Sequence, residues 1–178
     1  MSRPGRRLVR ALEEHRAALA AFVRRASEVP PEGWRRSPAP GKWSPAEITE
    51  HVTLAVEKLH LELQGEPPMK VILSPWVRLY LRWMILPGIL RTGRFPPGAR
   101  APREIRPSEP AAPQLEALRR LEAAHARFEA ACAEPSAAGR FLTHPYFGPL
   151  PIARYHRLLA RHAQHHGRQL PDRQGESS

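Results

Sequence analysis

Residues 44–63, SPAEITEHVTLAVEKLHLEL, carry the clearest helix signal in this 178-residue sequence. Ser44 is a favourable N-cap, a proline occupies the first helical position, and Glu47 completes a capping box. Apolar residues then recur every three or four positions, and Gly65 ends the pattern. The stretch therefore predicts an amphipathic helix, and its buried stripe contains a histidine, His51.

The same periodicity predicts three more long helices, which cover residues 6–27, 113–133 and 151–170. A short amphipathic helix is expected to open at Ser74 and to end at Pro87, and residues 134–149 are expected to form a loop. Four long helices with one long crossover predict an all-α, four-helix bundle, with a short extra helix in the crossover. We expect a single domain over residues 1–178, with its core at about 6–170 and a frayed tail at 171–178.

Composition argues against several classes of protein. A single cysteine excludes an intramolecular disulfide framework and any Cys-rich zinc site, and Cys132 is interpreted as inert packing. No secretory leader or uncharged membrane span is evident, so a cytoplasmic location is expected. The net charge of +11 raises nucleic acid as a partner, but the basicity is almost all arginine, which is typical of GC-rich genomes. No nucleic-acid-binding motif is recognisable, so this partner is disfavoured.

The last predicted helix carries His162 and His166 on its apolar stripe, one turn apart. Antiparallel or crossed packing would bring His51 to the same end of the bundle. Three imidazoles on rigid helices, with ligand positions left open, would form a metal site of the catalytic type. The alternative is that these are hydrogen-bonded core histidines, because His-x-x-x-His occurs by chance in many helices.

Other residues are placed near this predicted site with less specific signals. Gln169, one turn past His166, is expected to touch a ligand histidine or the substrate. His165 offers a competing i, i+3 pair with His162 but falls off the apolar stripe, and His125 is a candidate fourth ligand, more simply a satisfied core histidine. Three further histidines are not placed near the site and are interpreted as residues at the sides of their helices or on the surface; they are His15, His60 and His156. Aromatic walls of a substrate pocket are expected from Trp34, Trp43, Tyr146, Phe147 and Tyr155.

Three motifs in this order resemble the DinB-like superfamily of small helical proteins. They are residues 41–51 (GKWSPAEITEH), 144–150 (HPYFGPL) and 162–169 (HAQHHGRQ). Residues 101–107 also resemble the linker of the larger branch of this family, and the resemblance spans roughly residues 8–170. It implies a four-helix bundle with a long crossover, and a divalent metal, variously zinc, nickel or iron. The residues that would bind the metal are His51, His162 and His166, and those beside it or against substrate are Gln169, Tyr155, Trp43 and His144.

Members of the family with known activity resemble S-transferases and isomerases that use the thiols bacillithiol or mycothiol, and others are called metal-dependent hydrolases. The resemblance thus implies a mononuclear metalloenzyme acting on a small molecule, with a low-molecular-weight thiol as a candidate cofactor and a homodimer as a common state. Ala163 stands where a zincin keeps its glutamate base, which favours thiolate transfer over peptide hydrolysis.

Two non-catalytic functions stay open beside this expectation. Residues 67–107 carry eight basic side chains against one glutamate and would suit nucleic acid. Residues 76–85 combine tryptophan, tyrosine and arginine and would suit a membrane surface or a second subunit.

Overall fold

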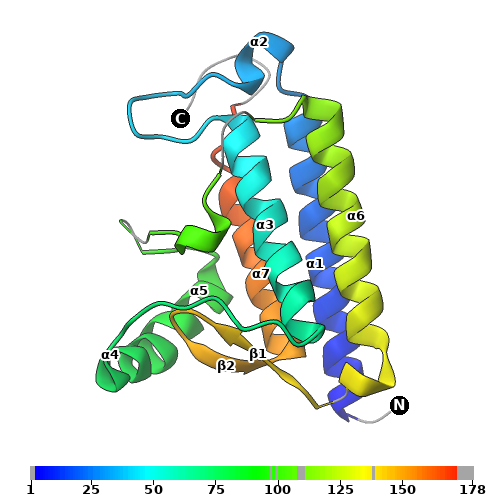
Figure 1. Ribbon diagram of the computed structural model, residues 1–178, viewed down its shortest axis with the longest axis vertical. Coiled ribbons are helices and arrows are strands. Elements are labelled where there is room, and N and C mark those ends of the chain that lie inside the picture. The colour runs from blue at the N-terminus through cyan, green and yellow to red at the C-terminus, as the bar shows by residue number, and fades with distance from the viewer. Residues whose placement is uncertain (1–2, 97, 99, 108–110, 138, 172–178) are drawn as a thin grey trace.

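The computed structural model describes residues 3–96, 98, 100–107, 111–137 and 139–171, so most of the predicted frayed tail lies outside the described residues. Four long helices form a bundle (Figure 1). They are α1 (Arg3–Ser27), α3 (Pro45–Leu63), α6 (Gln114–Ala133) and α7 (Ile152–Gly167). The predicted all-α, four-helix fold class is therefore confirmed. None of the described helices is both long and apolar enough to cross a membrane.

The order of the helices decides where the histidines meet. Helix α1 packs chiefly along α7, and α3 packs chiefly along α6. Helices α3 and α6 run in the same direction, because the crossover between them returns the chain along the length of the bundle (Figure 1). Helix α7 runs the opposite way, so its C-terminal end lies beside the start of α3.

The start of α3 is fixed by the predicted capping box. The Ser44 hydroxyl accepts a hydrogen bond from the Glu47 amide, and the Glu47 carboxylate accepts one from the Ser44 amide. Two amide donors that the helix leaves unpaired are thereby satisfied. His51 lies one helical turn after Glu47, so the position of this cap also fixes where the His51 ring lies along the bundle.

The crossover holds more helix than expected. It contains α4 (Pro75–Tyr80), a π-helical turn η1 (Leu81–Ile85), α5 (Leu86–Thr92) and a short 3-10 turn η2 (Arg103–Ile105). The prediction that Pro87 ends the first of these is wrong. The proline occupies the first turn of α5, where no amide donor is needed, and the helix ends at Gly93, whose φ is 67°.

Short elements were missed at two other places. The predicted loop at 134–149 instead contains the 3-10 turn η3 (Pro135–Ala137) and an antiparallel hairpin of β1 (Phe141–His144) with β2 (Gly148–Pro151). The loop at 29–42 contains α2 (Pro31–Trp34). Four-residue strands are too short to show a convincing alternation, and three of the four residues of β2 are glycine or proline.

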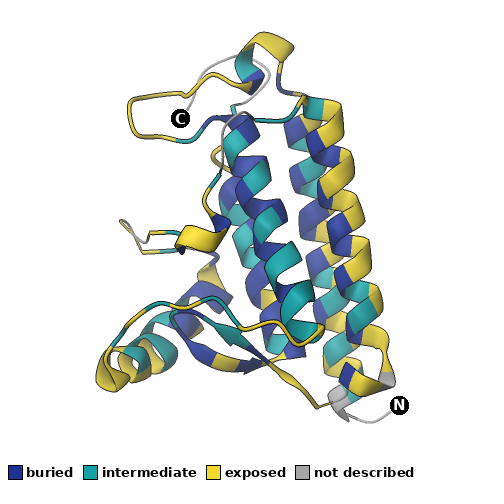
Figure 2. Ribbon diagram, viewed as in Figure 1, coloured by how far each residue is buried: buried dark blue, intermediate teal, exposed yellow. Residues whose placement is uncertain are grey.

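Buried side chains line the faces that the long helices turn toward one another (Figure 2). Phe22, Leu121 and Phe128 are among the fully buried residues at the centre of the bundle. Cys132 is buried as well, and burial raises the pKa of its thiol to about 12. The thiol therefore stays protonated, in agreement with its interpretation as packing.

Candidate metal centre

Three imidazoles meet where α3 begins and α7 ends. His51 comes from the second turn of α3, and His162 and His166 come from successive turns near the end of α7. One ring nitrogen from each lies within 4.8 Å of the other two. His162 Nε2 is the central atom, 3.1 Å from His51 Nε2 and 3.1 Å from His166 Nε2. The antiparallel passage of α3 and α7 thus unites residues that are 111 positions apart.

Hydrogen bonds on the far side of two rings decide which nitrogens face the centre. His51 Nδ1 lies 2.8 Å from the Ile105 carbonyl oxygen, and His166 Nδ1 lies 2.7 Å from Gln169 Oε1. Oxygens of this kind only accept hydrogen bonds, so each Nδ1 carries the proton. In the neutral rings, Nε2 of His51 and Nε2 of His166 are therefore bare and present lone pairs to His162.

This donor set fits a divalent cation. His162 Nε2 can donate its single hydrogen to only one of the two facing lone pairs, which leaves the other unsatisfied in a buried place. A cation at the centre would accept all three nitrogens. The 3.1 Å separations are close to the roughly 3.3 Å expected between nitrogens that bind zinc tetrahedrally at about 2.0–2.1 Å.

Burial keeps these rings in the form that binds metal. It lowers the pKa of His51, an effect that the hydrogen bond to Ile105 opposes. Burial also lowers the pKa of His166 to about 3, with His51 contributing, and it lowers that of His162 well below its usual value, helped by both neighbouring rings. All three imidazoles are thus neutral at pH 7, and a metal would not have to displace protons from charged rings.

A cavity of about 720 Å³ borders the three histidines. The four residues that the sequence analysis placed beside the metal or the substrate all line it; they are Trp43, His144, Tyr155 and Gln169. The Trp43 ring centre lies 4.8 Å from that of His51, and Gln169 contacts His166 as described. Burial raises the pKa of Tyr155, so its hydroxyl keeps its proton.

His144 is held in one orientation by the hairpin turn. Its Nδ1 accepts hydrogen bonds from the amides of Tyr146 and Phe147, at 3.2 and 3.3 Å. Burial lowers its pKa to about 3, so the ring is neutral and its proton resides on Nε2. His144 therefore offers the cavity a fixed, uncharged hydrogen-bond donor.

The other expected wall residues divide into two groups. Tyr146 and Phe147 line the cavity, whereas Trp34 does not. Trp34 is the last residue of α2, and its ring is buried in the core, where the indole donates a hydrogen bond to the Ala112 carbonyl. Its assignment as a wall of the cavity is therefore wrong. The sequence analysis also missed walls that the crossover contributes, which are Met69, Leu73, Leu81, Ile85, Ile89 and Phe95.

The structure places His125 away from the cavity, in a second histidine cluster inside the bundle. His15 Nδ1 lies 3.0 Å from His156 Nδ1 and 3.2 Å from His125 Nε2, so α1, α6 and α7 each contribute one ring. The interpretation of His15 and His156 as flank or surface residues is wrong, because they are 1% and 0% exposed. His165 is half-buried and its ring contacts Gln169 and Phe95 rather than the central nitrogens.

Carboxylates are missing from the cavity walls as far as the described residues go. The nitrogen and hydroxyl groups that reach it belong to histidine, tyrosine, tryptophan, glutamine, Lys42 and Arg100. Glu47 is engaged in the cap of α3, and Glu62 accepts a hydrogen bond from the Thr143 amide. A carboxylate general base at this site is therefore not supported.

Comparison with protein families gives a match to the family model described as the DinB superfamily, over residues 11–170. The match covers α3, α6, α7, the crossover and the three histidines, and α1 from residue 11 onward. Comparisons with curated proteins and with solved structures give no significant match.

Proposed function

Because this chain belongs to the DinB superfamily, we propose that it is an enzyme that uses one divalent metal ion, held by His51, His162 and His166. The observation that carries the proposal is the pair of bare Nε2 atoms, fixed by Ile105 and Gln169, that face His162 Nε2. His162 can satisfy only one of these two lone pairs, and the other is costly to bury unless a cation lies between the rings.

A divalent ion with only neutral ligands keeps its full charge and strongly lowers the pKa of a water or thiol that binds it. The chain's own residues position the reactants. Gln169 and Ile105 hold two ligand rings in orientation, and His144, fixed by the hairpin turn, has its Nε2 hydrogen free to donate to a bound molecule. The apolar walls exclude water and accept a small molecule with substantial apolar surface.

Of the two chemistries, the walls favour thiol S-transfer. Hydrolysis benefits from a base that removes a proton from attacking water, and no carboxylate is found among the described wall residues. A thiolate needs no such base once it has formed. Its sulfur would bond to an electrophilic carbon, the leaving group would depart with its electron pair, and the thiol proton would pass to solvent.

The test is a comparison of two assays on protein purified without a histidine tag. We expect metal-dependent loss of free thiol when bacillithiol or mycothiol is supplied with an apolar alkyl or aryl halide. We expect no comparable hydrolysis of apolar esters without thiol. Ester hydrolysis at a higher rate than thiol consumption would overturn the S-transfer proposal in favour of a hydrolase, and activity unaffected by chelation would overturn both.

Replacing Gln169 by leucine is expected to weaken zinc binding by about 10–100-fold. The variant removes the acceptor of the His166 Nδ1 proton and so frees the ring to rotate or to change tautomer. Competition with a chromogenic chelator measures the affinity. Gln164→Leu is the matched control, because Gln164 lies in the last turns of α7, close to Gln169 in sequence, and contacts Arg161 instead; equal weakening in both variants would contradict the assigned contact.

A further inference from the structure

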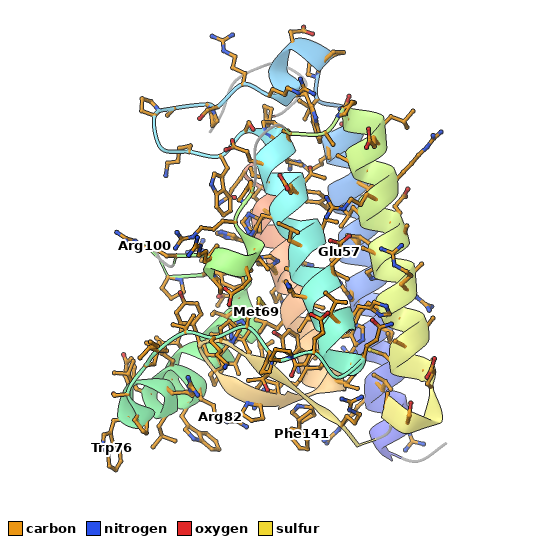
Figure 3. The ribbon with its side chains drawn as sticks, viewed as in Figure 1. Glu57, Met69, Trp76, Arg82, Arg100 and Phe141 are labelled. Atoms are coloured by element: carbon orange, nitrogen blue, oxygen red, sulfur yellow. The ribbon has the colours of Figure 1, made fainter. Side chains whose placement is uncertain are left out.

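Residues 75–85, comprising α4 and η1, form an arm that projects from the side of the bundle (Figure 1). Its outward side is apolar and exposed; the side chains are Trp76, Val77, Leu79, Tyr80, Trp83 and Met84. Trp76 and Trp83 are 79% and 65% exposed, and Trp76 points away from the protein at the tip of the arm (Figure 3). Outside the arm, the large apolar residues described as exposed are scattered; they are Val9, Ile72, Leu115 and Phe141.

The arm is held in place by its other side. Arg82 donates hydrogen bonds to the carbonyls of Phe147 and Pro149 in the hairpin, and Arg78 donates to the Val71 carbonyl. Leu81 and Ile85 face the cavity beside the three histidines. The arm therefore has an inner side of two arginines and two aliphatic residues, and an outer side whose tryptophans are exposed, unlike the polar outer face of an ordinary surface helix.

The chemistry of the exposed face is that of a membrane interface. Trp76, Tyr80 and Trp83 follow one another at i, i+4 and i+7, so they share one face with aliphatic neighbours. Indole and phenol rings favour the boundary between lipid headgroups and acyl chains, where one end is apolar and the other wet.

The exposed face of the arm could bind a lipid surface or a second copy of this chain, and the charge of the protein favours the lipid surface. Exposed cations lie on both sides of the arm in the sequence of the crossover, at Lys70, Arg91, Arg94 and Arg100, whereas the only acidic residue between positions 67 and 107 is Glu104. A second copy would bring another net charge of +11 against this face. Anionic headgroups would instead be attracted, by about 1 kcal/mol for each cation near the surface.

We propose that the arm docks on the surface of bilayers that contain anionic lipids, with Trp76 and Trp83 inserted at the headgroup level. Docking does not depend on metal or on catalysis. Since the inner side of the same arm lines the cavity, docking places that cavity beside the bilayer.

The test is flotation of the full chain with vesicles of phosphatidylcholine alone or mixed with phosphatidylglycerol, with tryptophan fluorescence as a second readout. We expect binding to the mixed vesicles only, reduced by salt, with a blue shift on binding. Trp76→Ser with Trp83→Ser should lower the vesicle affinity by at least about tenfold. Leu115→Ser and Phe141→Ser each remove an exposed apolar side chain outside the arm, and these variants should bind as the parent does.

Three results would overturn the proposal. The first is no flotation with phosphatidylglycerol vesicles at low salt. The second is equal loss of binding in the Leu115 and Phe141 variants, which would place the contact outside the arm. The third is a dimer in light scattering that dissociates in the double tryptophan variant and floats no better than a control protein, which would assign the face to a second copy.

Discussion

Replacing His162 by alanine is expected to abolish stoichiometric binding of a divalent metal. Its Nε2 is the central nitrogen of the cluster, 3.1 Å from the ligand atoms of both other histidines. Without it, His51 and His166 remain as two ligands from separate helices, too few for a stable site on a mononuclear ion. His51→Ala should have the same consequence, since it removes the only ligand that α3 supplies.

The stability change gives this prediction a direct readout. A ligand that binds only the folded chain stabilises it by about 2.7 kcal/mol at one hundred times its dissociation constant. For a chain of this size, that corresponds to a rise of roughly 5–10 °C in Tm. We expect such a rise for the parent protein on addition of zinc, nickel or ferrous iron, and none for His162→Ala. Elemental analysis of the purified proteins should agree.

His165→Ala is the matched control. His165 lies one position from a proposed ligand and on the same helix, but its Nε2 contacts the Gln169 amide instead of the central nitrogens. This variant should keep the metal and the thermal shift. Retention of both by His162→Ala would place the metal elsewhere in the protein. A parent protein that none of these metals stabilises would remove the proposed centre altogether.

Much of this arrangement follows from sequence periodicity. The cap at Ser44 and the stripe that follows it fix both α3 and the inward direction of His51. The His162 and His166 spacing fixes their common face on α7. The meeting of the two helices then requires only that they run antiparallel, which the connectivity of the bundle provides.

The rest depends on long-range contacts that carry no local signal. The Ile105 carbonyl orients His51 although the two residues are 54 positions apart. Every residue has a backbone carbonyl, so the residue type at position 105 does not reveal this contact. The wall residue from α5, Ile89, was missed because the sequence predicts a helix end at Pro87. The histidines at 15 and 156 were misplaced because burial of a polar residue depends on its partners, which periodicity does not identify.

The second histidine cluster, formed by His15, His125 and His156, is expected to make the folded protein much less stable in acid. Burial lowers the pKa of His156 to about 3 and also lowers those of His15 and His125, and the neighbouring rings add to the effect at His15 and His156. From α1, Arg16 faces the cluster, and from α6, Glu129 lies 3.8 Å from His125 Nε2 while it also binds Arg16. This ion pair does not supply a free counter-charge for protonated imidazoles inside the bundle.

The sign of the pH effect follows from proton binding. In the unfolded chain a histidine titrates near pH 6.5, whereas His156 in the folded protein does not gain its proton until about pH 3. Between these values the unfolded state holds the extra proton, so the free energy of unfolding falls as the pH falls. The loss for this one residue is about 1.4 kcal/mol per pH unit below pH 6.5, or about 2 kcal/mol at pH 5. His15 and His125, whose pKa values burial also lowers, change the stability in the same direction.

His156→Leu isolates the effect, because leucine fills a similar space and does not titrate. We expect urea unfolding to give similar stability to the parent at pH 8 and about 2 kcal/mol more than the parent at pH 5. Phe128→Leu is the control: its ring lies 5.1 Å from that of His156, and the smaller side chain should cost a similar amount at both pH values. Protons taken up by the proposed metal ligands affect all three proteins alike and cancel in the differences. A His156→Leu difference that is the same at pH 8 and pH 5 would mean that His156 is not held neutral by burial, and the acid sensitivity of the fold would then have to arise from other groups.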